Sequence, residues 1–198
     1  GDLDGDGKEE VVNALSRTVW EIRNPGGGLR SSSPSLGSAS GIQVVDLDGD
    51  GKLEIAGTES WFDRVFVLGQ GMKRRWWHST GEDPVGPVVG DLDGDGKKEI
   101  VVGSILGNVN CYSSKGESRW VTGTQLPLSK LALLRMKKGP PVILVAGARA
   151  LVFVSTTGTI IDRLSLPSSI LHVAVVREKG QPDSAVIALK TGLYRIAN

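Results

Sequence analysis

"DLDGDGK" is the sequence of Asp2–Lys8, and the same seven residues recur at Asp46–Lys52 and Asp91–Lys97. The intervals between copies are 44 and 45 residues, and a glutamate follows two residues after each lysine. One acidic, glycine-rich stretch can be a solvated turn and nothing more. Three copies at a near-constant interval indicate an internal structural repeat.

The residues between the copies predict short β-strands. They form runs that are rich in valine and isoleucine and are bounded by glycine, aspartate and serine. In the second and third units these runs are Ile42–Val45, Glu54–Gly57, Val65–Leu68, Arg74–His78, Pro87–Val89, Glu99–Gly103, Val109–Tyr112 and Ser118–Val121. Sustained 3.6-residue periodicity is absent from the sequence, which therefore predicts almost no helix.

Five repeat units follow from this rhythm, at approximately residues 1–40, 41–84, 85–128, 129–168 and 169–198. The first unit lacks a first strand and predicts strands at Glu10–Val12, Thr18–Ile22 and part of Leu29–Ser33, whereas the last unit stops after its third strand. The Ser-, Gly- and Pro-rich stretch Asn24–Ser40 predicts a loose surface loop.

Units of about 40–45 residues with four strands each are typical of β-propeller blades. The sequence therefore predicts an all-β fold, a β-propeller of four-stranded antiparallel blades that forms one domain or part of a larger ring. A β-sandwich could be built from similar strands, but the constant period favours the propeller.

Composition excludes several classes of protein. The formal net charge is +1 and the sequence has no basic run, which argues against nucleic acid binding. Cys111 is the only cysteine, so no disulfide can form within the chain. Apolar runs stay far below the ~18–20 residues of a membrane span. The chain opens directly on an acidic repeat and has no signal peptide, so we expect a piece of a longer, extracellular or cell-surface protein.

The acidic repeat has the composition of a calcium loop. Three aspartates at alternate positions repel one another unless a cation binds them, and the glycine at position six permits a sharp turn. Carboxylates and a backbone carbonyl form the oxygen-only shell that Ca²⁺ prefers. We therefore predict up to three structural Ca²⁺ ions. Their predicted ligands are Asp2, Asp4, Asp6, Lys8 and Glu10; Asp46, Asp48, Asp50, Lys52 and Glu54; and Asp91, Asp93, Asp95, Lys97 and Glu99, each lysine acting through its carbonyl.

An EF-hand loop begins in the same way, but it needs a glutamate at position twelve and flanking helices. Position twelve is Asn13, Gly57 or Val102 here, and the predicted flanks are strands. The EF-hand interpretation therefore fails. A metal-free solvated turn remains the simpler alternative for any one copy, while three copies in register favour metal binding.

The loop with its following strand, "DLDGDGKKEIVVGS" (Asp91–Ser104), and the later Gly116–Trp120 resemble the FG-GAP/VCBS repeat family of calcium-loop β-propellers, which includes the integrin α-subunit head. The resemblance implies that each acidic loop joins the first two strands of a blade. It also implies that the loops share one rim and that ligands meet the opposite rim.

The fourth and fifth units depart from this pattern. The positions of the three aspartates are taken by Arg135, Lys137 and Gly139 in the fourth unit and by Arg177, Lys179 and Gln181 in the fifth. The favoured interpretation is a solvated basic turn. The alternative is that an arginine or lysine bonds a nearby carboxylate and replaces the ion.

Catalytic motifs are absent, and His78 and His172 are both interpreted as structural residues. The predicted function is a non-catalytic binding module for a protein or glycan; the alternative is the propeller of a carbohydrate-active enzyme such as a polysaccharide lyase. Trp61, in a predicted loop, and Trp77, in a predicted strand, are candidate ligand-binding residues, although loop packing would also explain Trp61. Trp20 and Trp120 are predicted to pack between units.

Overall fold

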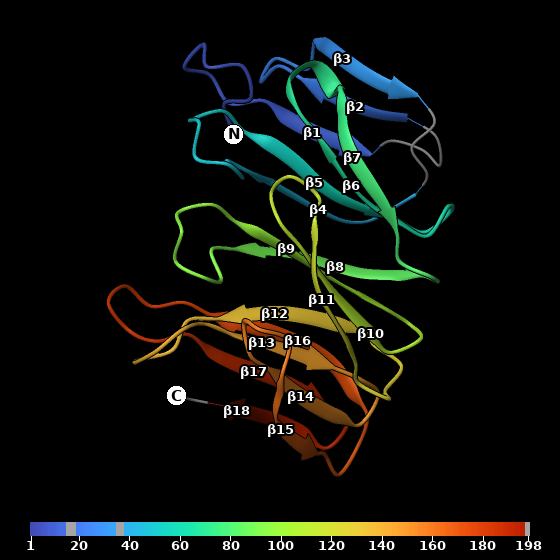
Figure 1. The fold of residues 1–198 in the computed structure, drawn as a ribbon, viewed down its shortest axis with the longest axis vertical. Helices are drawn as coiled ribbons and strands as arrows, with labels where there is room; N and C mark the ends of the chain where they lie inside the picture. Colours follow the sequence, from blue (N-terminus) through green and yellow to red (C-terminus); the bar gives the residue numbers. More distant parts are fainter. Residues whose placement is uncertain (15–18, 35–37, 197–198) are drawn as a thin grey trace.

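The computed structural model describes residues 1–14, 19–34 and 38–196. Their strands form five antiparallel sheets, each made of strands that follow one another in the chain (Figure 1). The all-β propeller architecture predicted from the repeat is thus confirmed. Within the described part the only helix is a short 3₁₀ turn, η1 (Gln70–Met72), and it is not a candidate membrane span.

We number the sheets one to five in chain order. Sheet one holds β1 (Val11–Ala14), β2 (Val19–Arg23) and β3 (Leu29–Pro34). Sheet two holds β4 (Ala39–Val45), β5 (Glu54–Glu59), β6 (Arg64–Leu68) and β7 (Arg74–Ser79). Sheet three holds β8 (Pro84–Gly90), β9 (Glu99–Ser104), β10 (Asn108–Tyr112) and β11 (Ser118–Gly123). Sheet four holds β12 (Lys130–Leu134), β13 (Val142–Ala146), β14 (Ala150–Val154) and β15 (Ile160–Ser165). Sheet five holds β16 (Ile170–Val176), β17 (Ser184–Leu189) and β18 (Gly192–Ile196).

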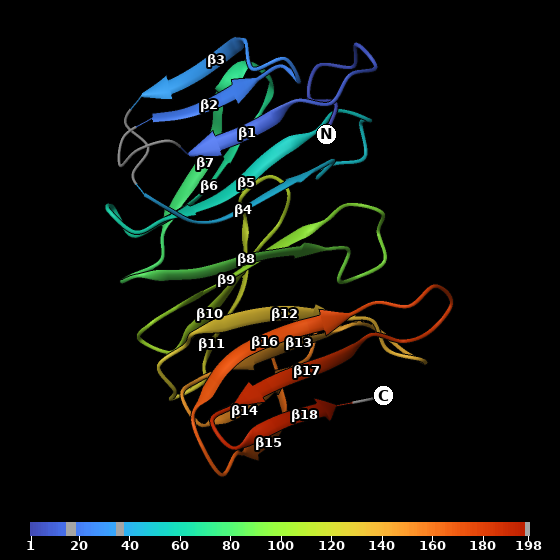
Figure 2. The same cartoon turned by 180° about the vertical axis from the view of Figure 1, so that it is seen from behind.

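The two outer sheets have three strands each among the described residues. An acidic repeat precedes β1 just as the next one precedes β5, so β1 corresponds to the second strand of a complete sheet. Among the described residues, sheet one therefore has no first strand and sheet five no fourth, as the sequence predicts. In Figures 1 and 2 the sheets succeed one another from sheet one at the top to sheets four and five at the bottom.

Apolar side chains fill the boundaries between consecutive sheets. Four clusters of buried side chains occupy the four boundaries, centred on Trp20 and Phe66, on Leu47 and Ile100, on Val109 and Ile143, and on Leu151 and Ile187. Alternating residues of each inner strand point toward one neighbour or the other. This division explains why β5, β9 and β13 are buried along their whole length.

One part of the sequence interpretation is wrong. The stretch Asn24–Ser40 is not a loose loop, since it contains β3 and the first residues of β4, whereas the strand predicted within Leu29–Ser33 is confirmed as β3. Ser31, Ser32 and Ser33 pair with β2 through backbone hydrogen bonds, which do not depend on side-chain hydropathy. Residues 35–37 of this stretch, and Thr18 of the predicted strand Thr18–Ile22, lie outside the described residues.

Candidate metal centre

The three acidic loops, Asp2–Glu10, Asp46–Glu54 and Asp91–Glu99, share one internal hydrogen-bond pattern. In the second loop Asp46 Oδ1 accepts from the Gly49 N–H at 2.8 Å, and its Oδ2 accepts from the Gly51 N–H at 3.1 Å. The first aspartates of the other two loops make the same pair of bonds. Both glycines have a left-handed backbone, with φ of 79° and 83° in this loop, which explains why the repeat requires glycine there.

The last glutamate of each loop fastens the loop to the sheet. Glu54 is 3% exposed, and its Oε2 accepts from the Leu47 N–H at 3.0 Å. Glu10 and Glu99 bond Leu3 and Leu92 in the same way, at 2.8 and 2.9 Å. The three leucines are buried, so the second position of the repeat anchors each loop in the core.

The aspartates that the repeat predicts as ligands lie close together. One carboxylate oxygen from each member lies within 4.8 Å of the others in three groups, which are Asp2, Asp4 and Asp6; Asp46, Asp48 and Asp50; and Asp91, Asp93 and Glu99. In the second group, Asp48 Oδ1 is a buried oxygen without a hydrogen-bond partner. Such an oxygen is costly to bury unless a donor or cation meets it. The carbonyl ligands predicted at Lys8, Lys52 and Lys97 stay a prediction.

The surroundings shift the pKa values of these carboxyl groups in opposite directions. Burial raises the pKa of Glu54 and of Glu99. Burial also acts to raise the pKa of Asp2, but the N–H groups of Gly7 and Gly5 outweigh it and lower that pKa. The turn thus keeps Asp2 charged, because the N–H bonds it makes favour the ionised carboxylate.

An arginine that the sequence interpretation missed reaches each acidic loop. Arg75 on β7 lies 2.8 Å from Asp48 Oδ2 and 2.9 Å from Glu54 Oε1. Arg30 on β3 contacts Asp4 and Glu10, and Arg119 on β11 lies near Asp93 and Glu99. A sequence signal existed for two of them, because Arg75 and Arg119 each precede a tryptophan at the same place in the repeat.

In sheets four and five an ion pair occupies the place of the acidic loop. The Asp183 side chain is fully buried, and its Oδ1 accepts hydrogen bonds from Arg135 Nε at 3.0 Å and from an Arg135 terminal nitrogen at 2.8 Å. Arg177 Nε lies 3.5 Å from its Oδ2. Arg135 and Arg177 thus bond a carboxylate, as in the alternative interpretation, although their side chains stay 60% and 61% exposed. Lys137, Gly139, Lys179 and Gln181 are exposed as well.

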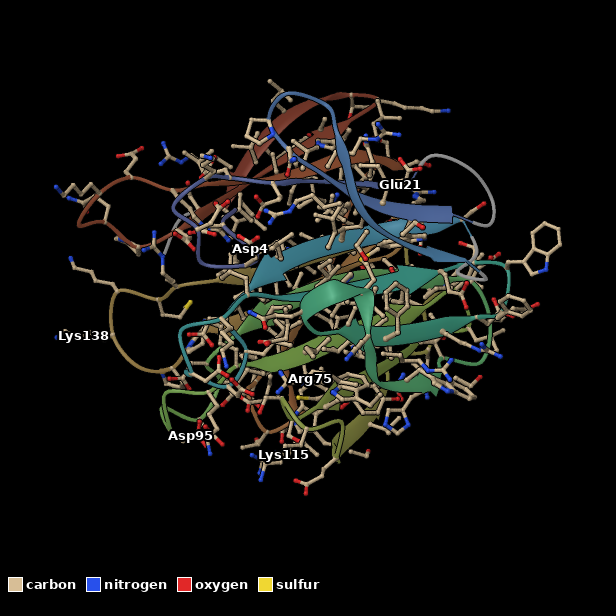
Figure 3. All side chains as sticks on the ribbon, turned by 90° about the horizontal axis from the view of Figure 1, so that it is seen from above. Asp4, Glu21, Arg75, Asp95, Lys115 and Lys138 are labelled. Carbon is tan, nitrogen blue, oxygen red and sulfur yellow. The ribbon has the colours of Figure 1, made fainter. Side chains whose placement is uncertain are left out.

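The candidate ligand-binding tryptophans lie away from the acidic loops. Trp61 is in the loop between β5 and β6, at the opposite end of β5 from the second acidic loop, and it is 59% exposed. The Arg64 guanidinium carbon lies 4.6 Å from the Phe62 ring centre and 4.3 Å from that of Trp77. We call Trp61, Phe62, Arg64 and Trp77 the aromatic rim. Asp4 precedes β1, Asp95 precedes β9 and Lys138 precedes β13, and all three are labelled in the left half of Figure 3.

Several other aromatic residues pack between neighbouring sheets. Trp20 is fully buried between sheets one and two. Trp120 Nε1 donates to the Thr156 carbonyl of sheet four at 2.8 Å. His78 stacks on Tyr112 with ring centres 4.6 Å apart, so its role is structural, whereas His172 is exposed on β16.

The comparisons with known proteins agree with this geometry. Residues 2–57 match the model of the FG-GAP-like repeat, a segment that includes the first two acidic repeats. A search of the curated proteins finds no significant match.

Several solved structures share the fold at low sequence identity. BBS1N, crystallised in complex with ARL6DN, matches with a TM-score of 0.74 and 13% identity over 96% of this chain and 60% of its own. Saccharomyces cerevisiae Sqt1 matches with a TM-score of 0.74 and 13% identity over 96% of this chain and 57% of its own. The biofilm matrix protein Bap1 of V. cholerae matches with a TM-score of 0.64 and 20% identity over 89% of this chain and 32% of its own.

The chain thus spans 60% or less of the length of these three structures. Identities this low carry the fold and no more. The family match adds a specific repeat to that fold: residues 2–57 carry an FG-GAP-like repeat, and the chain folds as blades of a β-propeller.

Proposed function

We propose that the chain is a calcium-stabilised β-propeller module that binds a protein or glycan and has no catalytic activity of its own. The observation that carries the proposal is the repetition of one loop geometry at three places in register. Each loop gathers three carboxylates within 4.8 Å of one another. Repulsion among so many anions makes the folded state depend on a counter-charge.

The residues present fit a hard divalent cation. The donor set is made of oxygens, with carboxylates on a turn that glycines make tight, and such a set suits Ca²⁺ better than Zn²⁺ or copper. Asp48 Oδ1, buried and without a hydrogen-bond partner, supplies an oxygen that a cation would satisfy. A bound Ca²⁺ would neutralise the aspartates and rigidify the turn between two strands of a blade.

An interaction role accords with the surface at the other end of the strands. The aromatic rim exposes 59% of Trp61, 45% of Phe62 and 42% of Trp77. Exposed aromatic side chains are frequent anchors of protein ligands, and their flat faces stack well on sugar rings. BBS1N is crystallised with a protein partner, and Bap1 is a matrix protein, so both structures are compatible with binding. Millimolar Ca²⁺ outside cells would fill such loops, and we propose an extracellular or cell-surface location on this ground.

Thermal unfolding in CaCl₂ and in EGTA tests the calcium role. A ligand present at 100 times its dissociation constant stabilises the folded state by about 2.7 kcal/mol per site. We expect Tm to rise by several degrees in millimolar CaCl₂ and to rise far less in an equal concentration of MgCl₂. Equal Tm values in CaCl₂ and EGTA would refute the calcium role.

Glycan and protein arrays probed with the wild-type chain and with Trp61→Ala test the aromatic rim. We expect the variant to lose binding and to keep the wild-type Tm. Leu193→Ala is the matched control, because Leu193 is 75% exposed on β18, far from the rim along the chain. Equal loss of binding in both variants would contradict a specific role of Trp61.

A further inference from the structure

The arginines that reach the acidic loops occupy one structural position. In sheet two the register of β6 and β7 passes from Val67–Trp76 to Leu68–Arg74, so Arg75 is the extra residue of a β-bulge. The pairing of β2 with β3 skips Arg30, and the pairing of β10 with β11 skips Arg119. A bulge re-aims one side chain, and here it aims each arginine at the loop of its own sheet.

Sheet four supplies an internal comparison. Its outermost strand, β15, has the same bulge, and the skipped residue is Ile161. No acidic repeat precedes β13 in this sheet, and Ile161 lines a shallow apolar hollow with Met136 instead. The arginine thus accompanies the carboxylates, while the bulge itself occurs with or without them.

The contact between arginine and loop is graded. Arg75 and Arg30 each lie 2.9 Å from the glutamate that ends their loop. Arg119 lies 3.6 Å from Asp93 and 3.9 Å from Glu99. In that third loop the glutamate joins the close group of carboxylates, whereas the groups in the first two loops consist of the three aspartates. In the two loops where the arginine lies 2.9 Å from the ninth-position glutamate, that glutamate is therefore not part of the close group of carboxylates.

We propose that Arg30, Arg75 and Arg119 compete with Ca²⁺ for the third-position aspartate and the ninth-position glutamate of each loop, and that the third loop consequently binds Ca²⁺ most tightly. This inference rests on the proposed calcium role. A guanidinium offsets one negative charge and holds one glutamate oxygen. A dication that recruits the same oxygens must break that pair and also meets the repulsion of the arginine. Three loops that share one heptapeptide would then respond to two ranges of calcium concentration.

Calorimetric titration of the 198-residue chain with CaCl₂ tests the order of affinities. We expect one ion to bind more tightly than the other two. Asp93→Ala should remove that ion, and Asp48→Ala should retain it. Loss of the tightest ion in Asp48→Ala with its retention in Asp93→Ala would overturn the order that we infer.

Arg75→Gln tests the competition itself. This substitution removes the charge and should tighten one of the weaker sites about tenfold, while Arg119→Gln should change its site by less than threefold. Arg75→Lys keeps the charge and should remain near the wild-type affinity. Arg74→Gln is the matched control, since Arg74 is exposed and adjacent to Arg75 in β7, and it should alter nothing. Arg30→Gln repeats the test in the first loop if Arg75→Gln fails to fold.

The outcomes separate the two proposals. Absence of calcium binding in the wild-type chain refutes the proposed function and the competition with it. If the wild-type chain and Arg75→Gln both bind three ions, and all these sites have equal affinities, the competition is refuted while the proposed calcium role stands. Weaker binding in Arg75→Gln also refutes it, because the arginine would then position the ligands rather than compete for them.

Discussion

Arg135 and Asp183 join the fourth and fifth sheets through a two-sided contact. The Arg135 side chain donates two hydrogen bonds to Asp183 Oδ1, and its backbone N–H donates to Oδ2 at 3.0 Å. The Asp183 N–H in turn donates to the Arg135 carbonyl at 2.9 Å. These contacts connect sheet four to sheet five at the position where the first three sheets carry their acidic loops. The contacts themselves involve only Arg135 and Asp183.

Asp183→Asn should destabilise the fold. The substitution keeps the shape of the side chain and removes its charge, and hydrogen bonds to a charged group contribute about 1.5–3 kcal/mol. We expect urea denaturation to show a loss of about 2 kcal/mol. Asp162→Asn, at an exposed aspartate of β15, is the control and should stay within about 0.5 kcal/mol of wild type. Equal effects of the two substitutions would contradict the role assigned to the ion pair.

The same pair predicts a dependence of stability on pH. Burial acts to raise the pKa of Asp183, but the hydrogen bonds from Arg135 outweigh it, so the pKa lies below its ordinary value of 3.8. A carboxyl group with a lowered pKa stabilises the folded state above its unfolded pKa and loses this effect as the pH falls through the folded value. The difference in unfolding free energy between wild type and Asp183→Asn should be constant from pH 7 to about 5 and shrink below about 4. A difference that grows toward low pH would contradict this assignment.

Asp93→Ala should reduce the number of bound calcium ions by one. Asp93 shares a close group with Asp91 and Glu99, and the other two loops do not depend on it. Native mass spectrometry should count three ions in the wild-type chain and two in the variant. Asp162→Asn again serves as a control, with three ions expected. An unchanged count in Asp93→Ala would refute the metal assignment of the third loop.

Gly158→Ala should destabilise the contact between sheets three and four. Gly158 has a φ of +84°, and a Cβ there would lie 2.7 Å from the Trp120 ring. Gly139 has a φ of +89° with nothing within 4 Å of such a Cβ. Gly139→Ala should therefore lower the free energy of unfolding only through backbone strain, by about 1 kcal/mol. Gly158→Ala should lower it by about 2–4 kcal/mol, because the added Cβ also displaces the Trp120 ring. Chemical denaturation of both variants measures the difference. Equal losses of unfolding free energy would show that the Trp120 ring moves without a penalty, and would contradict the prediction.

Much of the fold is predictable because the acidic repeat marks the same turn each time. A loop of constant length sets where the second strand begins, and hence Glu54 and Glu99 start β5 and β9 as predicted. The strand β3 was predicted only as part of Leu29–Ser33, within a stretch that was otherwise interpreted as a loop. Its serines carry no hydropathy signal, and only pairing with β2 makes them a strand.

The parts of the site that escaped prediction depend on distant partners. Arg75 is aimed by a register shift between two strands, and strand register is set by the turn and by packing on both faces. Asp183 lies 48 residues from Arg135, and its position in the sequence gives no sign that it will be buried beside it. The aspartates of the loops were predictable because the residues of each group lie within nine consecutive positions of the sequence.

The division of the core among four boundaries has a consequence for unfolding. Each boundary is lined by two consecutive sheets, so detaching sheet one or sheet five exposes a single apolar cluster, whereas opening sheet three exposes two. Stability in such an array is a sum over nearest neighbours. Within these 198 residues, the free energy of local opening should therefore be lower for sheets one and five than for the three sheets between them.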